Sequence, residues 1–350
     1  MRSYLKCDIQ TLFKNIDRKI RNLIILIKLV KNPIIVLLVY LGYIEEKNIT
    51  LRNNRLVRIR HNNWGDDFLL MRMLSDLNVE LNEDMITIKS LNISFSRQET
   101  YFAWQIYNNL KGLTDFKASR VSNQELLIEF KYNNHNLRFL IPIEWSGSFL
   151  EFYKYEAYSS LHINDCVVID IGSSFGDTPL YFISKGAKFV IAVEPYERIY
   201  KYLVHNVNFN SVNDKVITMN KAVSSLKGVV KVFEGWTTLT AFPMDRVVTI
   251  ESITLSELIN LATKYGKCIS VKMDCEGCEF EAIPEALESG ALYNISDLIM
   301  EVHEKSHKKC IDLINLLKGK GFRVKVLNCV KQGRPYHRVC LVRVYREVTI

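Results

Sequence analysis

The sequence lacks internal repeats, low-complexity segments and a cleavable signal pattern with a small-residue exit. Its eight cysteines are scattered and do not form the framework typical of small secreted proteins. We therefore expect a cytoplasmic protein with reduced thiols. The chain does contain 48% hydrophobic and 24% charged residues, as folded globular proteins do, and its 350 residues suffice for two domains.

The chain also lacks a strong excess of charge. Its net charge of +8 allows attraction to anionic surfaces, but charge at this level says nothing about fold. The densest basic run comprises Arg52, Arg55, Arg58, Arg60 and His61. Because no RNA-binding signature accompanies this run, we interpret it as a strand with a solvated face and do not expect nucleic acid as a partner.

Two short motifs suggest metal binding, but the surrounding sequence lacks the further features that each metal site requires. Cys275-Glu-Gly-Cys278 offers two thiolates at chelating spacing, yet no second ligand pair occurs at a matching spacing. His303-Glu-Lys-Ser-His307 matches H-E-x-x-H, a zinc motif that requires both histidines on one helix. Here His303 closes a strand-like run, so the two histidines would straddle a strand-to-helix junction. We predict no metal site at either motif.

The most informative stretch is an apolar run that ends at Asp170. A turn bounded by Gly172 and Gly176 follows it, and then a helix-like segment. A second apolar run, Phe189 to Val193, is followed by Glu194. Parallel strands deliver nucleoside ligands to their carboxyl ends in this way, and a carboxylate at the tip of the second strand can accept both hydroxyls of a ribose.

The spacing of the glycines indicates which nucleoside binds. A dinucleotide site needs G-x-G-x-x-G so that the backbone can approach a pyrophosphate, but Ser173 and Ser174 occupy that part of the turn here. S-adenosylmethionine has a ribose and an adenine but no phosphate, and its cationic amino and sulfonium groups suit Asp170. The pattern predicts S-adenosylmethionine; the alternative is an ordinary turn in a ligand-free α/β domain.

Six segments resemble the FkbM-type S-adenosylmethionine-dependent methyltransferases in order and spacing, and the likeness covers about residues 150 to 345. The segments are Val168–Thr178, Val193–Pro195, His205–Asn210, Lys221–Ser224, Lys272–Glu279 and Met300–His303. Members of the family usually have Ala-Asn where this chain has Ser173-Ser174, and Val and Ala in place of Cys275 and Cys278.

The resemblance implies a class I, Rossmann-like methyltransferase fold and O-methylation, often of a sugar or polyketide hydroxyl. It implies cofactor-binding roles for Asp170, Gly172, Ser173, Gly176, Glu194 and Ala222. It does not imply which acceptor is methylated, because the family is diverse.

Strand and helix patterns alternate from residue 166 onward, which predicts an α/β sheet. Seven strands are expected, at 166–171, 188–193, 215–220, 268–273, 296–302, 322–328 and 337–345. The last two are joined by a loop too short for a parallel crossover, so they must pair antiparallel. The sequence thus predicts a seven-stranded methyltransferase sheet with a C-terminal antiparallel hairpin.

We divide the chain into segments 1–49, 50–145 and 146–350, the last being the methyltransferase domain. The middle segment shows a smaller α+β pattern. Its expected elements are strands at 56–59 and 85–88, helices at 66–77 and 99–110, and a hairpin over 126–143 around Asn133-Asn134. No cluster of chemically active residues occurs there, so we expect it to shape the acceptor site or to dock a partner.

Residues 23–44 are strongly apolar but make a marginal membrane span. Lys28, Lys31 and Pro33 interrupt the run and offset much of the insertion energy of its Leu, Ile and Val residues. Two interpretations stay open: a helix buried against the rest of the chain, or a helix pair lying in the plane of an anionic membrane surface.

Methyl transfer to a hydroxyl requires a group that removes the proton, and such a group should follow a central strand. Asp274 ends the fourth predicted strand, Glu276 and Glu279 follow in its turn, and His303 ends the fifth. We expect Asp274 to be the base or to orient the hydroxyl, with His303 or Glu276 as alternative bases. Glu279 could merely favour the helix dipole. Sequence alone does not separate a metal-free site from one in which these acids hold Mg²⁺.

The function that we predict is S-adenosylmethionine-dependent O-methylation of a glycan or a related small hydroxyl compound. One alternative is an RNA or protein methyltransferase, although no Asn-Pro-Pro-Tyr-type element follows the fourth strand. Another is a catalytically silent S-adenosylmethionine-binding module at a membrane. The sequence does not predict an oligomeric state.

Overall fold

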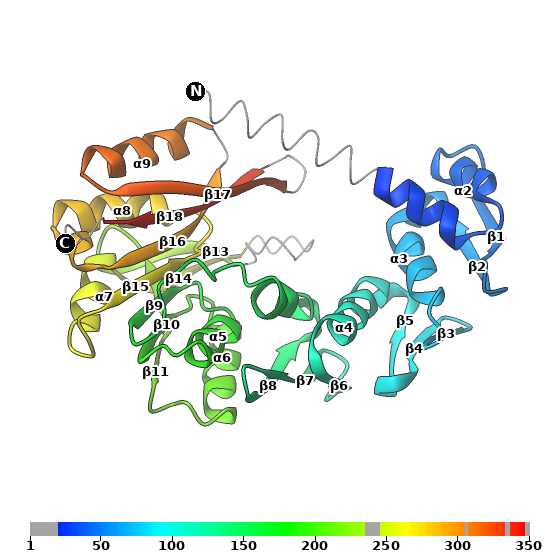
Figure 1. The fold of residues 1–350 in the computed structure, drawn as a ribbon, viewed down its shortest axis with the longest axis horizontal. Coiled ribbons are helices and arrows are strands. Elements are labelled where there is room, and N and C mark those ends of the chain that lie inside the picture. The colour runs from blue at the N-terminus through cyan, green and yellow to red at the C-terminus, as the bar shows by residue number, and fades with distance from the viewer. Residues whose placement is uncertain (1–19, 235–245, 305–306, 333–336, 347–350) are drawn as a thin grey trace. The chain divides into compact units, whose positions relative to one another are not determined.

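The computed structural model describes residues 20–234, 246–304, 307–332 and 337–346 (Figure 1). The start of the predicted 1–49 segment therefore lies outside the described residues. Contacts divide the chain into a first unit, Met1–Ile128 with Pro142–Gly147, and a second unit, Glu129–Ile141 with Ser148–Ile350.

The first unit is a small α+β structure. A helical stretch over residues 20–29 precedes its named elements. These are α2 (Pro33–Tyr40), β1 (Glu46–Thr50), β2 (Leu56–Arg60), α3 (Trp64–Leu74), β3 (Val79–Asn82), β4 (Met85–Ile88), β5 (Ile93–Ser96), α4 (Thr100–Gly112) and β6 (Thr114–Arg120). The two strands and two helices predicted in this region are confirmed, whereas β1, β3, β5 and β6 were not expected.

The predicted hairpin is formed by β7 (Glu125–Tyr132) and β8 (His135–Pro142). Its two turn residues, Asn133 and Asn134, have φ angles of 45° and 66°. A two-residue hairpin turn with positive φ at both positions matches the twist of the strands, and asparagine tolerates that conformation. The local sequence therefore determines this turn.

The second unit contains a seven-stranded sheet in the order β11-β10-β9-β15-β16-β18-β17. Its strands are β9 (Val167–Ile171), β10 (Phe189–Val193), β11 (Val216–Met219), β15 (Ile269–Met273), β16 (Asp297–Glu304), β17 (Arg323–Gln332) and β18 (His337–Tyr345). Neighbours from β11 to β16 pair parallel, and β18 pairs antiparallel with both β16 and β17. The predicted α/β class, all seven strands and the C-terminal antiparallel hairpin are confirmed.

Helices cover the sheet and explain why its central strands are apolar. They are α5 (Asp177–Ser184), α6 (Glu197–Phe209), α7 (Leu255–Ala262), α8 (Glu279–Glu288) and α9 (His307–Gly319). Helix α5 packs against β9 and β10, α6 against β11, α7 against β9, and α9 against β16 and β17 (Figure 1). Every residue of β9 and β15 is buried, as expected of parallel strands that are covered on both faces.

A second, three-stranded sheet was not predicted. It consists of β12 (Ala222–Val223), β14 (Arg246–Ile253) and β13 (Gly228–Glu234), in that order. It lies in sequence between β11 and α7, where only a connection to the next strand of the main sheet was expected.

Six cysteines form disulfides, which corrects the expectation of reduced thiols. Their pairs are Cys166–Cys268, Cys275–Cys278 and Cys329–Cys340. The first pair is 102 residues apart in sequence. It forms because β9 and β15 are neighbours in the sheet, and Cys329 faces Cys340 across the β17–β18 ladder. Cytoplasmic localisation stays a prediction.

Candidate active site

The first turn after β9 is built on close backbone contacts. Gly172 has a φ of 75°, and a Cβ atom there would lie 1.8 Å from the carbonyl oxygen of Asp274. The amide of Asp274 in turn donates to the carbonyl of Ile171 at 3.0 Å. Glycine is therefore required at position 172 because two turns meet there, and any cofactor contact comes in addition.

The remainder of this turn is held by α6 and by an aromatic cluster. Asn206 donates its side-chain amide to the carbonyl of Phe175 at 2.8 Å. The ring of Phe175 is buried against Phe149, with ring centroids 5.6 Å apart. Gly176 then begins α5 with a φ of 97°. These contacts assign a structural role to Asn206, which belongs to the His205–Asn210 segment.

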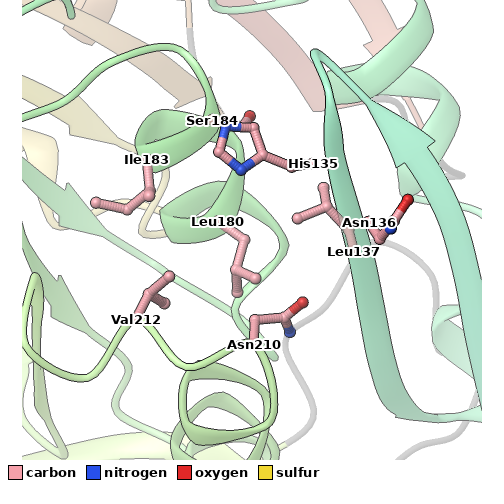
Figure 2. A pocket seen from close by; sticks show the side chains of 8 residues that line it. All are labelled: His135, Asn136, Leu137, Leu180, Ile183, Ser184, Asn210 and Val212. Carbon is pink, nitrogen blue, oxygen red and sulfur yellow. The ribbon is translucent and has the colours of Figure 1, made fainter.

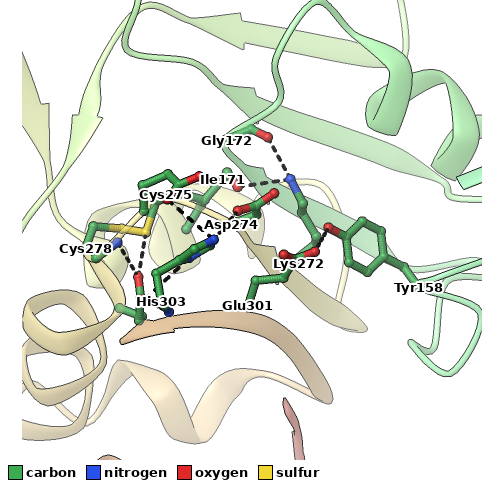
Figure 3. Close-up of polar contacts among 12 residues, drawn as sticks. Tyr158, Ile171, Gly172, Lys272, Asp274, Cys275, Cys278, Glu301 and His303 are labelled. Carbon is green, nitrogen blue, oxygen red and sulfur yellow. Dashed lines mark hydrogen bonds and ion pairs between the residues drawn. A yellow bond between two sulfur atoms is a disulfide. The ribbon is translucent and has the colours of Figure 1, made fainter. Parts of the chain in front are cut away.

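Asp170 is fully buried beneath the turn and is already partnered. Its Oδ2 accepts a hydrogen bond from the Thr178 hydroxyl at 2.6 Å, and its Oδ1 lies 3.2 Å from Nζ of Lys272. The Lys272 ammonium also donates to the Gly172 carbonyl at 2.6 Å (Figure 3). Ser173 is buried as well and donates its hydroxyl to the Asp170 carbonyl. Asp170 therefore supports the turn and balances the charge of Lys272.

Lys272 keeps its charge although it is buried. Burial lowers the pKa of its ammonium group, but Asp170 and Asp274 outweigh that effect and raise the pKa above the usual value. The sequence reasoning missed this residue, although it lies on β15 only two positions before Asp274, and alternate positions of an extended chain share a face.

Glu194 follows β10 and lies beside the first turn, as predicted. Its Oε2 accepts from the Ser174 amide and its Oε1 from the Tyr196 amide, both at 3.0 Å. Burial raises the pKa of this carboxyl to about 7, although the two amides oppose the rise. Because a carboxylate has about four acceptor positions, Glu194 can still accept hydroxyl groups. Ala222, the last predicted cofactor residue, is buried in β12.

Four ionisable side chains gather at the carboxyl ends of β15 and β16. They are Asp274, Glu276, Glu301 and His303, which we call the acid–histidine cluster. Nε2 of His303 lies 3.5 Å from Oε2 of Glu276 and 3.7 Å from Oδ1 of Asp274. Figure 3 shows His303, Asp274 and Glu301 near Lys272 at this edge. The structure thus brings together the three predicted catalytic residues and adds Glu301.

Glu279 holds the turn that carries the cluster. It is fully buried, its Oε1 accepts from the His303 amide at 2.7 Å, and its Oε2 accepts from the Gly277 amide at 2.9 Å. The turn after β15 has a strained backbone, since Glu276 has a φ of 56°. Glu279 therefore connects the turn after β15 to β16, which is more than a favourable contact with the helix dipole.

Burial and close charges shift the pKa values of His303, Glu276 and Glu301. Burial lowers the pKa of His303, but Glu279, Asp274 and Glu276 outweigh it and raise the value to about 9. Burial raises the pKa of Glu276 to about 7, although the His303 charge opposes the rise. Burial, with Asp274 and Glu151 nearby, also raises the pKa of Glu301.

Glu301 belongs to a second buried contact that sequence reasoning did not find. The Tyr158 hydroxyl donates to its Oε1 at 2.9 Å (Figure 3). Glu151, from a π-helical turn at Leu150–Lys154, adds another carboxyl whose pKa burial and Asp274 raise. Glu301 lies two residues before His303 on β16, so strand alternation could have indicated it. Nothing local in the sequence indicates Tyr158 or Glu151.

Metal binding is possible by geometry at one place in this region. Ligand atoms of Asp274, Glu301 and His303 lie within 4.8 Å of one another, a spacing that a divalent cation could bridge. Cys275 and Cys278 are bonded to each other and offer no thiolate pair.

A small cavity elsewhere in the second unit is not a candidate site (Figure 2). Its volume is 70 Å³, well below the roughly 300 to 1,000 Å³ of typical ligand pockets. It is lined by residues such as His135, Ser184 and Asn210. The Asn210 amide is already used on backbone carbonyls, so the cavity offers little chemistry.

One family model matches part of the chain. Residues 170–324 match the model of the methyltransferase FkbM domain. The matched region begins at Asp170 and extends into β17, so it contains both the first turn and the acid–histidine cluster. None of the curated proteins searched matches the chain significantly.

Solved structures show weaker likenesses. TYW2 from P. horikoshii, in complex with MeSAdo, is 14% identical over 79% of this chain and 94% of that chain, with a TM-score of 0.36. TYW2 from M. jannaschii, in complex with AdoMet, is 16% identical over 67% of this chain and 98% of that chain, with a TM-score of 0.35. A precorrin-6y C5,15-methyltransferase from Geobacter metallireducens is 12% identical over 53% and 82%, with a TM-score of 0.31. Likenesses this low add nothing to the family match.

Proposed function

Because residues 170–324 form a methyltransferase FkbM domain, we propose that this S-adenosylmethionine-dependent methyltransferase acts on a hydroxyl of a glycan or a related small molecule. The observation that carries the proposal is the pairing of Glu276 with His303 in the acid–histidine cluster, at the edge where the first turn also ends. It provides a proton acceptor beside the expected cofactor position.

The first turn fits S-adenosylmethionine. The Ser174 hydroxyl is buried and has no hydrogen-bond partner among the described residues, which is costly unless a ligand supplies one. Glu194 lies next to it and retains acceptor capacity for ribose hydroxyls. Ser174 and Glu194 would hold the nucleoside part of the cofactor.

The bound cofactor supplies an electrophilic methyl group, and the protein must remove the proton of the acceptor hydroxyl. His303, with a pKa of about 9, already carries a proton at neutral pH and cannot accept another. Glu276, with a pKa of about 7, is partly ionised there and matches the operating pH of a general base. We assign Glu276 as the base and give Asp274 the orienting role; His303 holds both carboxylates in place.

The charge of the site supports a neutral, polyhydroxylated acceptor. The carboxyl groups of Asp274, Glu276 and Glu279 lie 3.5 to 3.8 Å from the His303 imidazole, and those of Glu301 and Glu151 lie near Asp274. Carboxylates accept hydrogen bonds from hydroxyls and repel phosphates, so the site suits a sugar better than an RNA. This is the feature that favours a glycan over a nucleic acid acceptor.

A methyl-transfer assay tests the proposal. The full chain is incubated with labelled S-adenosylmethionine and with neutral oligosaccharides, RNA or unfolded protein as acceptors. We expect transfer to the oligosaccharides. Glu276→Gln should lower kcat by about 10² to 10⁴ while cofactor affinity by calorimetry stays near wild type.

Glu281→Gln is the matched control, since Glu281 lies in the first turn of α8, just after the turn that carries Glu276, but is exposed. Its activity should equal that of the wild type. Transfer to RNA or protein alone would replace the proposed acceptor class. Cofactor binding without transfer to any acceptor would support the silent binding module.

A further inference from the structure

Exposed apolar side chains are concentrated at the start of the first unit. Nine of the twenty large hydrophobic side chains that are exposed in the described residues belong to residues 20–43. They are Ile20, Leu23, Ile24, Ile27, Ile34, Leu37, Tyr40, Leu41 and Tyr43, which we call the apolar stripe. Scattered exposed apolar residues are normal, but such a concentration marks an interaction surface.

The stripe follows helical spacing. Ile20, Leu23, Ile24 and Ile27 are three, four and seven positions apart, and such positions share one helix face. In α2, Ile34 and Leu37 are also three apart, and Ile34 is 69% exposed. Each helix therefore presents a continuous apolar row to its surroundings.

The opposite faces of the same helices are anchored in the first unit. Leu26, Val30, Val36 and Val39 are buried, and Val30 forms a bridge with Leu51. Helix α2 packs against β1 and β2. Because the inner faces are fixed by this packing, the outer apolar rows cannot rotate inward.

The charge around the stripe is positive. Residues 1–44 contain eight Lys and Arg residues against two Asp residues, and residues 20–44 contain no acidic residue. Lys28 and Lys31 are exposed beside the stripe. Each basic residue near an anionic membrane contributes about 1 kcal/mol of attraction.

We propose that the apolar stripe docks the protein on the surface of an anionic lipid bilayer. The two helices would lie in the interface plane, with their apolar rows among the acyl chains and Lys28 and Lys31 at the headgroups. Among the described helices, none is both long and apolar enough to cross a bilayer. The apolar rows together with the basic residues favour an anionic lipid surface as the binding partner. This proposal does not depend on which acceptor is methylated.

Sedimentation with vesicles tests the proposal on the full chain. Vesicles of phosphatidylcholine and phosphatidylglycerol in equal parts should carry the protein into the pellet, and high salt or alkaline carbonate should release it. Ile24→Glu with Ile34→Glu should weaken vesicle binding at least tenfold. Lys28→Glu with Lys31→Glu should remove the preference for anionic over pure phosphatidylcholine vesicles.

The matched control is Leu77→Glu, because Leu77 is 71% exposed in the same unit but lies outside the stripe. Its vesicle binding should equal that of the wild type, and thermal unfolding and cofactor calorimetry show that each variant is folded. Equal binding to neutral and anionic vesicles, or wild-type binding by the Ile24 and Ile34 variant, would overturn the proposal. So would resistance to salt and carbonate, or a dimer in solution that binds no vesicles.

Discussion

The carboxylates at the ends of β9 and β10 are held differently from those at the ends of β15 and β16. Asp170 and Glu194 are buried, and donors lie within 3.0 Å of their oxygens. Asp274 and Glu276 instead face one imidazole, at 3.7 and 3.5 Å respectively, in a turn with a strained backbone.

This difference matches the two tasks of a methyltransferase. Cofactor binding is served best by a turn that is already held in place, because preorganisation lowers the cost of binding. Proton removal needs a carboxyl whose pKa lies near the working pH, and burial provides that for Glu276. One edge of the sheet therefore contains a rigid part, formed by the turns after β9 and β10, and the acid–histidine cluster.

The largest effect is expected from the buried cation that joins the two parts. Lys272→Met would leave the carboxylate of Asp170 buried beside Thr178 alone, and breaking a buried pair costs about 3 to 5 kcal/mol of unfolding free energy. Urea denaturation measures this loss. Lys267→Met, at an exposed position just before β15, should change stability by less than about 0.5 kcal/mol. Similar stabilities for the two variants would show that Lys272 is not a structural cation.

Gly172→Ala tests the rigid part through its backbone. The added Cβ meets the Asp274 carbonyl and also requires a positive φ, so we expect a loss of about 3 kcal/mol in unfolding free energy. Gly290→Ala is the control, since Gly290 has nearly the same φ, 77°, but nothing within 4 Å of its Cβ. It should lose only about 1 kcal/mol. Equal losses would mean that the two turns can separate without cost.

His303→Gln tests the acid–histidine cluster. The positive His303 side chain lowers the pKa of Glu276, so its removal should raise that pKa further above about 7. The acid limb of the kcat profile, where activity rises as Glu276 ionises, should move up by about one pH unit. A profile of kcat between pH 5 and 9 measures this shift. Loss of all activity across that range would instead identify His303 as the base.

The smallest effect concerns Glu194 and the cofactor. Since its pKa is about 7, affinity for S-adenosylmethionine should increase as pH rises from 6 to 8 and the carboxyl ionises. Glu194→Gln should bind about fivefold more weakly at pH 8 and show little dependence on pH, because an amide does not ionise. Calorimetry at three pH values measures both. A wild-type affinity that falls with pH would remove Glu194 from the ribose site.

Sequence reasoning predicted much of the fold because strands and helices of this type are encoded locally. Mainly apolar segments of five residues gave β9, β10 and β15, and Asn133-Asn134 gave the hairpin turn. The motif from Asp274 to Glu279 indicated where the cluster lies. The four-residue strands β3 and β5 were missed because brief, half-buried strands carry little pattern.

The side-chain pairs within the site could not be predicted, because their members are far apart in the sequence. Lys272 meets Asp170 across neighbouring strands, 102 positions away in sequence, as do Cys268 and Cys166. Tyr158 meets Glu301 from 143 positions away. Such pairs appear in no local pattern, so the sequence could not indicate that Asp170 is already neutralised.

The sequence by itself determined the order of strands and helices, the two turns of the cofactor edge and the acids after β15, because all of these follow from neighbouring residues. Only the tertiary structure decided which charges meet. It placed His303 between Asp274 and Glu276 and buried Glu194 and Lys272, and it left the apolar stripe exposed. The physical reason is that burial and Coulomb interactions depend on distance in space, which the chain fixes only when it folds.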